Sequence, residues 1–199
     1  MGASTLVDLM RHGEPVGGRR YRGQIDDPLS EKGWAQMWAA VGEAAPWQAI
    51  VSSPLQRCAA FADALAKRHD LPLHFDPRLM EVGFGAWEGH TADELRQADP
   101  EQLTRFYHDP VRHRPPGAEP LADFVARVGQ AFADVLATHA GRHVLVVCHA
   151  GVIRAVVAQV LQAPLSALYR LQVDSAGLTR IRADAEKPPT LLFHGGRLT

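Results

Sequence analysis

Three short segments combine residue types that bind and transfer phosphate. They are Arg11-His12-Gly13-Glu14, Ser53-Pro54-Leu55-Gln56-Arg57 and Cys148-His149-Ala150-Gly151. A neutral imidazole has a lone pair at neutral pH and can attack phosphorus. Guanidinium forks match two phosphate oxygens at a time, and backbone amides that open a helix can cradle an anion. Together the three segments predict phosphoryl chemistry.

Each segment follows a short apolar run of strand length. The runs are Leu6–Met10, Ala49–Val51 and Val144–Val147. In open α/β sheets, ligands bind beyond the carboxyl ends of the strands. We therefore expect the three segments to converge on one site, with Gly13 allowing a close backbone approach.

A departing phosphomonoester oxygen needs a proton, and the best candidate donor is Glu81. It opens the segment Glu81–Gly89, which carries three glycines, Phe84 and Trp87 and is predicted to be an ordered loop. Glu14 and Glu88 are second choices. A positioned carboxyl group is a common general acid.

Helices are predicted between and after the strands. The signals are apolar residues at helical spacing and Ser, Pro or Gly at the ends, including a capping hydroxyl at Ser53. The predicted helices cover residues 31–45, 55–69, 91–106 with an interruption at Pro100, 121–139 and 151–161. Further strands are predicted at 169–173, 178–181 and 191–193. This alternation predicts an α/β protein, a three-layer α/β/α sandwich with a mostly parallel central sheet.

Composition narrows the function classes. The 199 residues carry 21 Lys and Arg against 22 Asp and Glu, and this balance argues against a general nucleic-acid binder. Two cysteines are too few for a disulfide framework. No apolar run reaches the length of a membrane span, and no secretory signal is visible. We expect a cytoplasmic protein with no nucleic-acid or membrane partner.

The sequence also offers alternatives to attack by a histidine. Cys148, Gly151 and Arg154 have the spacing of cysteine-dependent phosphatases, but Val147 and Ala155 replace the usual neighbours, and His12 would have no role. No histidine or cysteine spacing indicates a metal site. A non-catalytic anion-binding module is a further alternative.

Four ordered segments resemble the histidine phosphatase superfamily, in its phosphoglycerate-mutase-like branch. They are R-H-G-E at residue 11, S-S-P-L-x-R at 52, E-x-x-F-G-x-W-E-G at 81 and C-H-A-G-V-I-R at 148, and the resemblance covers Leu6–Val160. It implies a single domain over residues 1–199, with a cap-like insertion around 76–120. It also implies a phosphohistidine intermediate and no metal or organic cofactor. The implied residues are His12 as nucleophile, Glu81 as proton donor, and Arg11, Arg57, His149 and the Ala150 amide as the phosphate pocket.

Within this family, the short first loop and the segment P-P-G-A-E at residue 115 resemble the α-ribazole phosphatase group. Gly17 and Gly18 stand where mutases have a phosphate-binding Asn, and Arg22 is the candidate to fill that gap. The implied substrate is a small phosphomonoester, with α-ribazole 5′-phosphate of cobalamin biosynthesis as the best guess. A phosphoglycerate-mutase-type transferase and a broad sugar-phosphate phosphatase are the alternatives, and a homodimer is left open.

Overall fold

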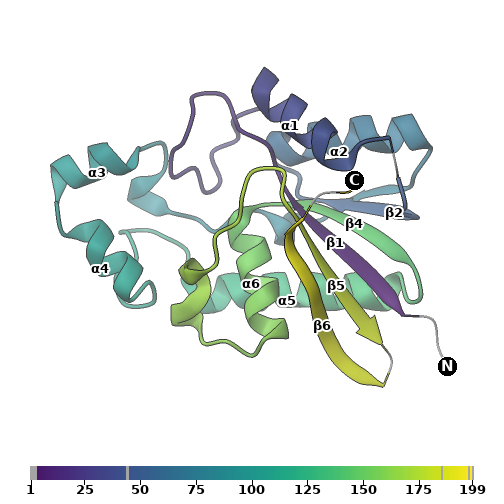
Figure 1. Ribbon diagram of the computed structural model, residues 1–199. Coiled ribbons are helices and arrows are strands. Elements are labelled where there is room, and N and C mark those ends of the chain that lie inside the picture. Colours follow the sequence, from purple (N-terminus) through teal and green to yellow (C-terminus); the bar gives the residue numbers. More distant parts are fainter. Residues whose placement is uncertain (1–3, 44, 185, 197, 199) are drawn as a thin grey trace.

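A mixed six-stranded sheet forms the centre of the molecule (Figure 1). The structure is a computed structural model that describes residues 4–43, 45–184, 186–196 and 198. Four strands run parallel in the spatial order β3 (Leu73–Phe75), β2 (Ala49–Ser52), β4 (His143–Cys148) and β1 (Thr5–Arg11). Two antiparallel strands continue the sheet beyond β1, namely β5 (Leu178–Asp184) and β6 (Lys187–Gly196). The predicted mostly parallel sheet is confirmed.

Helices cover both faces of this sheet. One face carries α1 (Glu31–Val41) and α2 (Gln56–His69), and the other carries α5 (Leu121–Thr138) and α6 (Ala150–Val160). Along β4, Leu145 and Val147 pack in the hydrophobic core under α1 and α2, whereas Val144 and Val146 pack in the core under α5 and α6. The strand is a continuous apolar run because successive side chains point to opposite, equally buried faces. The three-layer architecture is confirmed.

The segment 76–120 adds no strand to the sheet. It contains the 3-10 turns η1 (Pro77–Leu79) and η2 (Gly85–Trp87) and the helices α3 (Ala92–Ala98) and α4 (Gln102–His108). A capping box between Thr91 and Glu94 starts α3, and Pro100 stands at the predicted interruption before α4. Figure 1 shows both helices projecting away from the sheet. Their role as an inserted cap in a single domain stays a prediction.

One predicted strand is wrong. Residues 169–173 lie partly in the 3-10 turn η3 (Leu165–Arg170) and form no strand. The place beside β1 is taken by β5, so no free edge is left there for this segment. The ring of Tyr169 packs instead on Phe106, with ring centroids 4.7 Å apart.

The start of α2 also differs from expectation, because Ser53 does not cap it. The N-cap is Leu55, which has no capping side chain. Asp26, in the loop after β1, accepts a hydrogen bond from the backbone N–H of Gln56 at 2.6 Å. A carboxylate at a helix N-terminus satisfies a free amide and complements the helix dipole. This contact fastens the loop to α2.

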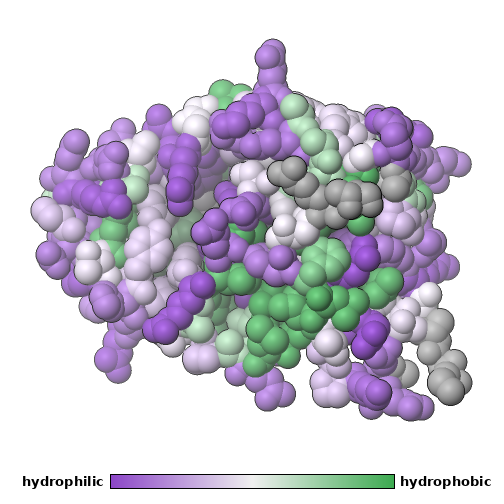
Figure 2. All heavy atoms as spheres, viewed as in Figure 1, coloured by the Kyte–Doolittle hydropathy of each residue, from purple (hydrophilic) through white to green (hydrophobic). Residues whose placement is uncertain are grey.

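Most of the visible surface is hydrophilic. In the space-filling view, hydrophobic residues gather over β6 and the adjoining part of α6 (Figure 2). Leu161 and Leu192 are among the exposed large hydrophobic side chains. Within the part of the chain that the structure describes, no helix is both long enough and apolar enough to cross a membrane.

Candidate active site

Backbone hydrogen bonds hold together the strand ends that carry the candidate residues. The N–H of His12, just beyond β1, donates to the Cys148 carbonyl at the end of β4, at 3.0 Å. The N–H of Ser53, just beyond β2, donates to the carbonyl of Val147, also at 3.0 Å. Parallel strands end at the same edge of a sheet, so the three motifs meet there.

The two imidazoles face each other across this edge. The ring centroids of His12 and His149 are 5.1 Å apart, and the ring planes cross at 64°. Nδ1 of His12 lies 2.7 Å from the carbonyl oxygen of Gly13. A carbonyl oxygen can only accept, so this bond places the proton on Nδ1 and the lone pair on Nε2. His12 is thereby held in the tautomer that a nucleophile attacking through Nε2 requires.

Burial keeps both rings neutral. Burial lowers the pKa of His12 well below its usual range, and the positive charges of Arg11 and Arg57 lower it further. The pKa of His149 is lowered in the same direction, first by burial and then by Arg57. Desolvation disfavours the charged form of a base, and nearby cations add to this effect. At neutral pH the site therefore presents unprotonated imidazoles beside guanidinium groups.

His149 has a partner that the sequence interpretation missed. Its Nε2 lies 2.8 Å from the hydroxyl oxygen of Ser53 and 3.6 Å from the thiol sulfur of Cys58. Ser53 and His149 are both fully buried. The sequence does contain a signal for this contact, because Ser53 follows the second apolar run as His149 follows the third. The Ser-Pro pair at residue 53 is also typical of a helix start, and that interpretation hides the contact.

Two guanidinium groups each leave one buried donor free. Arg57 donates to the carbonyls of Ile25 at 2.6 Å and Gly23 at 2.7 Å. Arg11 donates to the carbonyl of Val173 at 2.6 Å. Among the described residues, the buried Nε of each arginine has no hydrogen-bond partner. Native proteins rarely leave a buried donor unpaired, so each such group calls for an explanation.

Glu81 meets the helix that follows His149. One carboxylate oxygen accepts from the N–H of Val82 at 2.9 Å, and the other accepts from the N–H of Gly151 at 3.1 Å. Gly151 is the second residue of α6. The candidate acid thus lies at the N-terminus of the helix whose first residue, Ala150, was predicted to hold the phosphoryl group with its amide.

The alternative carboxylates have other partners. Glu14 forms an ion pair with Lys32 at 2.8 Å near the surface. Glu88 accepts from the backbone N–H groups of Gln24 at 3.1 Å, Ile25 at 3.2 Å and Phe84 at 3.0 Å. It thereby ties the loop after β1 to the Glu81 loop, and this structural role is one that the sequence interpretation did not foresee.

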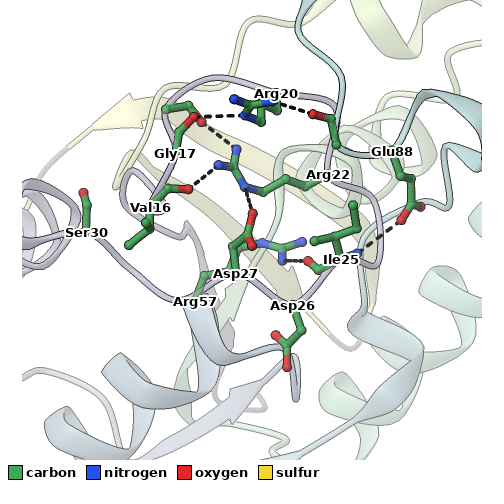
Figure 3. A network of polar contacts seen from close by, with 12 residues as sticks. Val16, Gly17, Arg20, Arg22, Ile25, Asp26, Asp27, Ser30, Arg57 and Glu88 are labelled. Atoms are coloured by element: carbon green, nitrogen blue, oxygen red, sulfur yellow. Dashed lines mark hydrogen bonds and ion pairs between the residues drawn. The ribbon is translucent and has the colours of Figure 1, made fainter.

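The loop after β1 is held by arginines, as Figure 3 shows. Arg22 donates to the carbonyls of Gly18 and Val16 and pairs with Asp27 at 2.8 Å. Its Nε and both of its terminal nitrogens are therefore engaged within the loop. Its charge still lowers the pKa of His12, after the larger effects of burial and of Arg11 and Arg57. Substrate binding by Arg22 stays a prediction.

The close backbone approach predicted at Gly13 is made to the backbone of α1. A Cβ built on Gly13 would lie 2.2 Å from the carbonyl oxygen of Gly33 in α1, and a Cβ on Gly33 would lie 2.2 Å from the carbonyl oxygen of Glu14. The two backbones touch with no side chain between them. This packing fixes the chain that follows His12 against α1.

Aromatic rings line the region beside the Glu81 loop. Phe106 is fully buried, and its ring packs edge-to-face against Trp87 at 5.1 Å and Tyr169 at 4.7 Å. The hydroxyls of Tyr21 and Tyr107 lie 2.7 Å apart. Burial raises the pKa of Tyr169 to about 12, and the negative charge of Glu81 acts in the same direction. Tyr107 is half exposed.

The cysteine alternative fits this geometry poorly. Cys148 is the last residue of β4 and is fully buried. Burial raises the pKa of its thiol well above its usual range. A reactive cysteine needs a thiolate, and this environment disfavours one. In the described residues, no cluster of three or more histidine, cysteine or carboxylate side chains is arranged to hold a metal ion.

Several known proteins are similar to this chain in overall sequence. Bifunctional protein Rv2228c of Mycobacterium tuberculosis (strain ATCC 25618 / H37Rv) is 38% identical over 183 residues, which are 89% of this chain and 50% of that protein. The chain thus spans about half the length of that relative. Phosphoserine phosphatase 1 of Hydrogenobacter thermophilus is 30% identical over 90% of this chain and 87% of its own. Adenosylcobalamin/alpha-ribazole phosphatase of Salmonella typhimurium is 30% identical over 83% of this chain and 84% of its own.

Solved structures share the fold. YhfR of Bacillus stearothermophilus superposes with a TM-score of 0.88 at 30% identity and covers 98% of both chains. The mycobacterial glucosyl-3-phosphoglycerate phosphatase Rv2419c gives a TM-score of 0.85 at 29% identity, over 97% of this chain and 99% of its own. The family model of the histidine phosphatase superfamily (branch 1) matches residues 7–194. The chain belongs to this superfamily, in its branch 1.

Proposed function

We propose that this protein is a phosphomonoesterase, which transfers a phosphoryl group from a small metabolite to Nε2 of His12 and then to water. In the first step the Nε2 lone pair forms a bond to phosphorus while the bond from phosphorus to the substrate oxygen breaks. Glu81 gives its proton to the departing oxygen. In the second step Glu81 takes a proton from water while the water oxygen forms a bond to phosphorus. The bond from phosphorus to Nε2 of His12 then breaks, and inorganic phosphate is released.

One observation carries this proposal: two buried arginine Nε donors without a partner belong to the groups whose charges act on His12. A bound phosphoryl group would give each donor an acceptor. Charge-assisted hydrogen bonds of this kind stabilise the oxygens as charge shifts during transfer. His149 lies opposite His12 and completes the pocket in the proposal, with the Ala150 amide as a further donor.

The first test compares His12→Ala with His139→Ala. His139 follows α5, outside the site, and burial lowers its pKa too. We expect His12→Ala to lose turnover of a phosphomonoester and His139→Ala to keep it. Cys148→Ser should also keep turnover, and an acid-labile phosphoprotein should be trapped with active enzyme only. Full activity of His12→Ala would overturn the proposal.

For the substrate we propose α-ribazole 5′-phosphate as the first compound to test. The support is the half-exposed ring of Tyr107 beside the aromatic cluster, which suits a leaving alcohol that carries an aromatic base. The relatives point to different phosphomonoesters, so phosphoserine, glucosyl-3-phosphoglycerate, 3-phosphoglycerate and sugar phosphates belong in the same panel. A higher kcat/KM on any of these than on α-ribazole 5′-phosphate would replace our substrate.

The mutase alternative differs only in the second step, where an alcohol rather than water takes the phosphoryl group. Release of inorganic phosphate at the rate of substrate loss would exclude it. Transfer to added phosphoglycerate, faster than release to water, would favour it.

A further inference from the structure

Gly151 leaves space for the carboxylate of Glu81. The N–H of Gly151 donates to one carboxylate oxygen at 3.1 Å. A Cβ built on Gly151 would lie 2.1 Å from the other oxygen and 3.3 Å from Cζ of Phe124. Any side chain at position 151 therefore has to push the carboxylate away.

The helix itself gives no reason for a glycine here. Gly151 lies in the first turn of α6, and its φ is not positive. Alanine is the better helix former, since glycine loses more backbone freedom on folding. The position thus favours alanine for stability and glycine for contact with Glu81.

We propose that Gly151 is a positioning residue for proton donation. With no side chain at this position, the Glu81 carboxyl group contacts the N-terminus of α6 beside the pocket that His12 and His149 form. The inference rests on the proposed role of Glu81 and adds the residue that sets the location of that acid.

Leaving groups of different basicity test this inference. An alkyl phosphate releases an alkoxide, which needs a proton, whereas 4-nitrophenyl phosphate releases a stable phenolate. In Gly151→Ala we expect kcat/KM for an alkyl phosphate to fall about 10- to 100-fold, and that for 4-nitrophenyl phosphate to fall less than about 3-fold. The kcat/KM ratio reports the first transfer step, so slow hydrolysis of the intermediate does not mask the difference.

Gly129→Ala is the matched control. Gly129 lies within α5, and a Cβ there would lie 2.2 Å from Nε2 of Gln159, the flexible end of another side chain. Both variants add the same methyl group to a helix, but only one meets the candidate acid. We expect Gly129→Ala to change both substrates equally, and both variants to stay folded by circular dichroism.

A double-mutant cycle separates this inference from the proposed function. If Gly151 acts through Glu81, Gly151→Ala should cause no further loss in a Glu81→Gln background. Equal losses on both substrates in Gly151→Ala, or a full additional loss in that background, would overturn the positioning role. A Glu81→Gln variant with no preference between leaving groups would instead overturn the role of Glu81 as the acid, and the inference with it.

Discussion

The hydroxyl oxygen of Ser53 lies 2.8 Å from Nε2 of His149, and both residues are fully buried. The contact joins the end of β2 to the end of β4. It holds the imidazole in one orientation beside His12, where a rotation of the ring would remove a partner from the proposed phosphate pocket.

Removal of the Ser53 hydroxyl should lower kcat/KM in addition to lowering the free energy of unfolding. In Ser53→Ala, a buried imidazole nitrogen loses its hydroxyl partner and keeps only the weaker contact with the Cys58 thiol at 3.6 Å. Loss of a buried hydrogen-bond partner typically costs about 1–3 kcal/mol of unfolding free energy. We also expect kcat/KM to fall by about one to two orders of magnitude, because His149 is no longer oriented. Ser52→Ala is the control, since the equally buried Ser52 hydroxyl donates to the Ser53 carbonyl. Equal activity in the two variants would argue against an orienting role.

Arg57 should not tolerate lysine. Its guanidinium donates to the carbonyls of Ile25 and Gly23, and its Nε keeps a third N–H for a ligand. The single ammonium group of lysine cannot place three donors in this fixed planar arrangement. We expect kcat/KM of Arg57→Lys to fall about 100-fold or more, as when a donor to a transition-state oxygen is lost. Arg78→Lys serves as control, because Arg78 pairs with Asp76 and Asp134 near the surface. Activity within twofold of the wild type for Arg57→Lys would contradict the assignment.

Glu88 should matter for structure and not for proton donation. In Glu88→Gln, an amide NH₂ faces backbone N–H groups that now donate to the carboxylate, so we expect a loss of about 1–3 kcal/mol in unfolding free energy. Activity on alkyl and 4-nitrophenyl phosphates should fall in parallel. A selective loss on the alkyl phosphate would identify Glu88 as the acid. Glu14→Gln, which alters only a surface ion pair with Lys32, should change stability by less than about 0.5 kcal/mol.

Acid should destabilise the fold through the buried imidazoles. The pKa values of His12 and His149 are lowered in the folded state, so between those values and the usual 6.5 the unfolded chain binds more protons. Their contribution to stability is complete above about pH 7 and is lost as the pH falls, by at most about 1.4 kcal/mol per pH unit for each ring. Urea unfolding between about pH 7 and pH 5 measures this slope.

Variants identify the source of that slope. The slope should be smaller in His12→Ala and His149→Ala than in the wild type, and unchanged in His90→Ala, whose side chain is exposed. An unchanged slope in both active-site variants would mean that other groups cause the acid dependence.

Much of this protein follows from local sequence patterns. The run Val144–Cys148 predicts a strand buried on both faces, and the helix 121–139 follows from apolar residues at 3–4 spacing, because these periods depend only on backbone geometry. The convergence of His12 and His149 also follows, since parallel strands end at one edge of a sheet. Residues 169–173 were misassigned as a strand because their apolar character fits packing on Phe106 equally well.

Only the tertiary structure decided which groups are free and which are engaged. Sequence spacing could not tell that the Ser53 hydroxyl contacts His149, that Arg22 hydrogen-bonds within its own loop, or that the Glu81 carboxylate accepts from the Gly151 amide. Each of these contacts joins residues that are distant in the chain, apart from the bonds of Arg22, which depend on the fold of its loop. Periodicity places a side chain on a face of a strand or helix, but a hydrogen bond depends on the position of two groups within a few tenths of an ångström. That position is set by packing of the whole molecule, which no local pattern encodes.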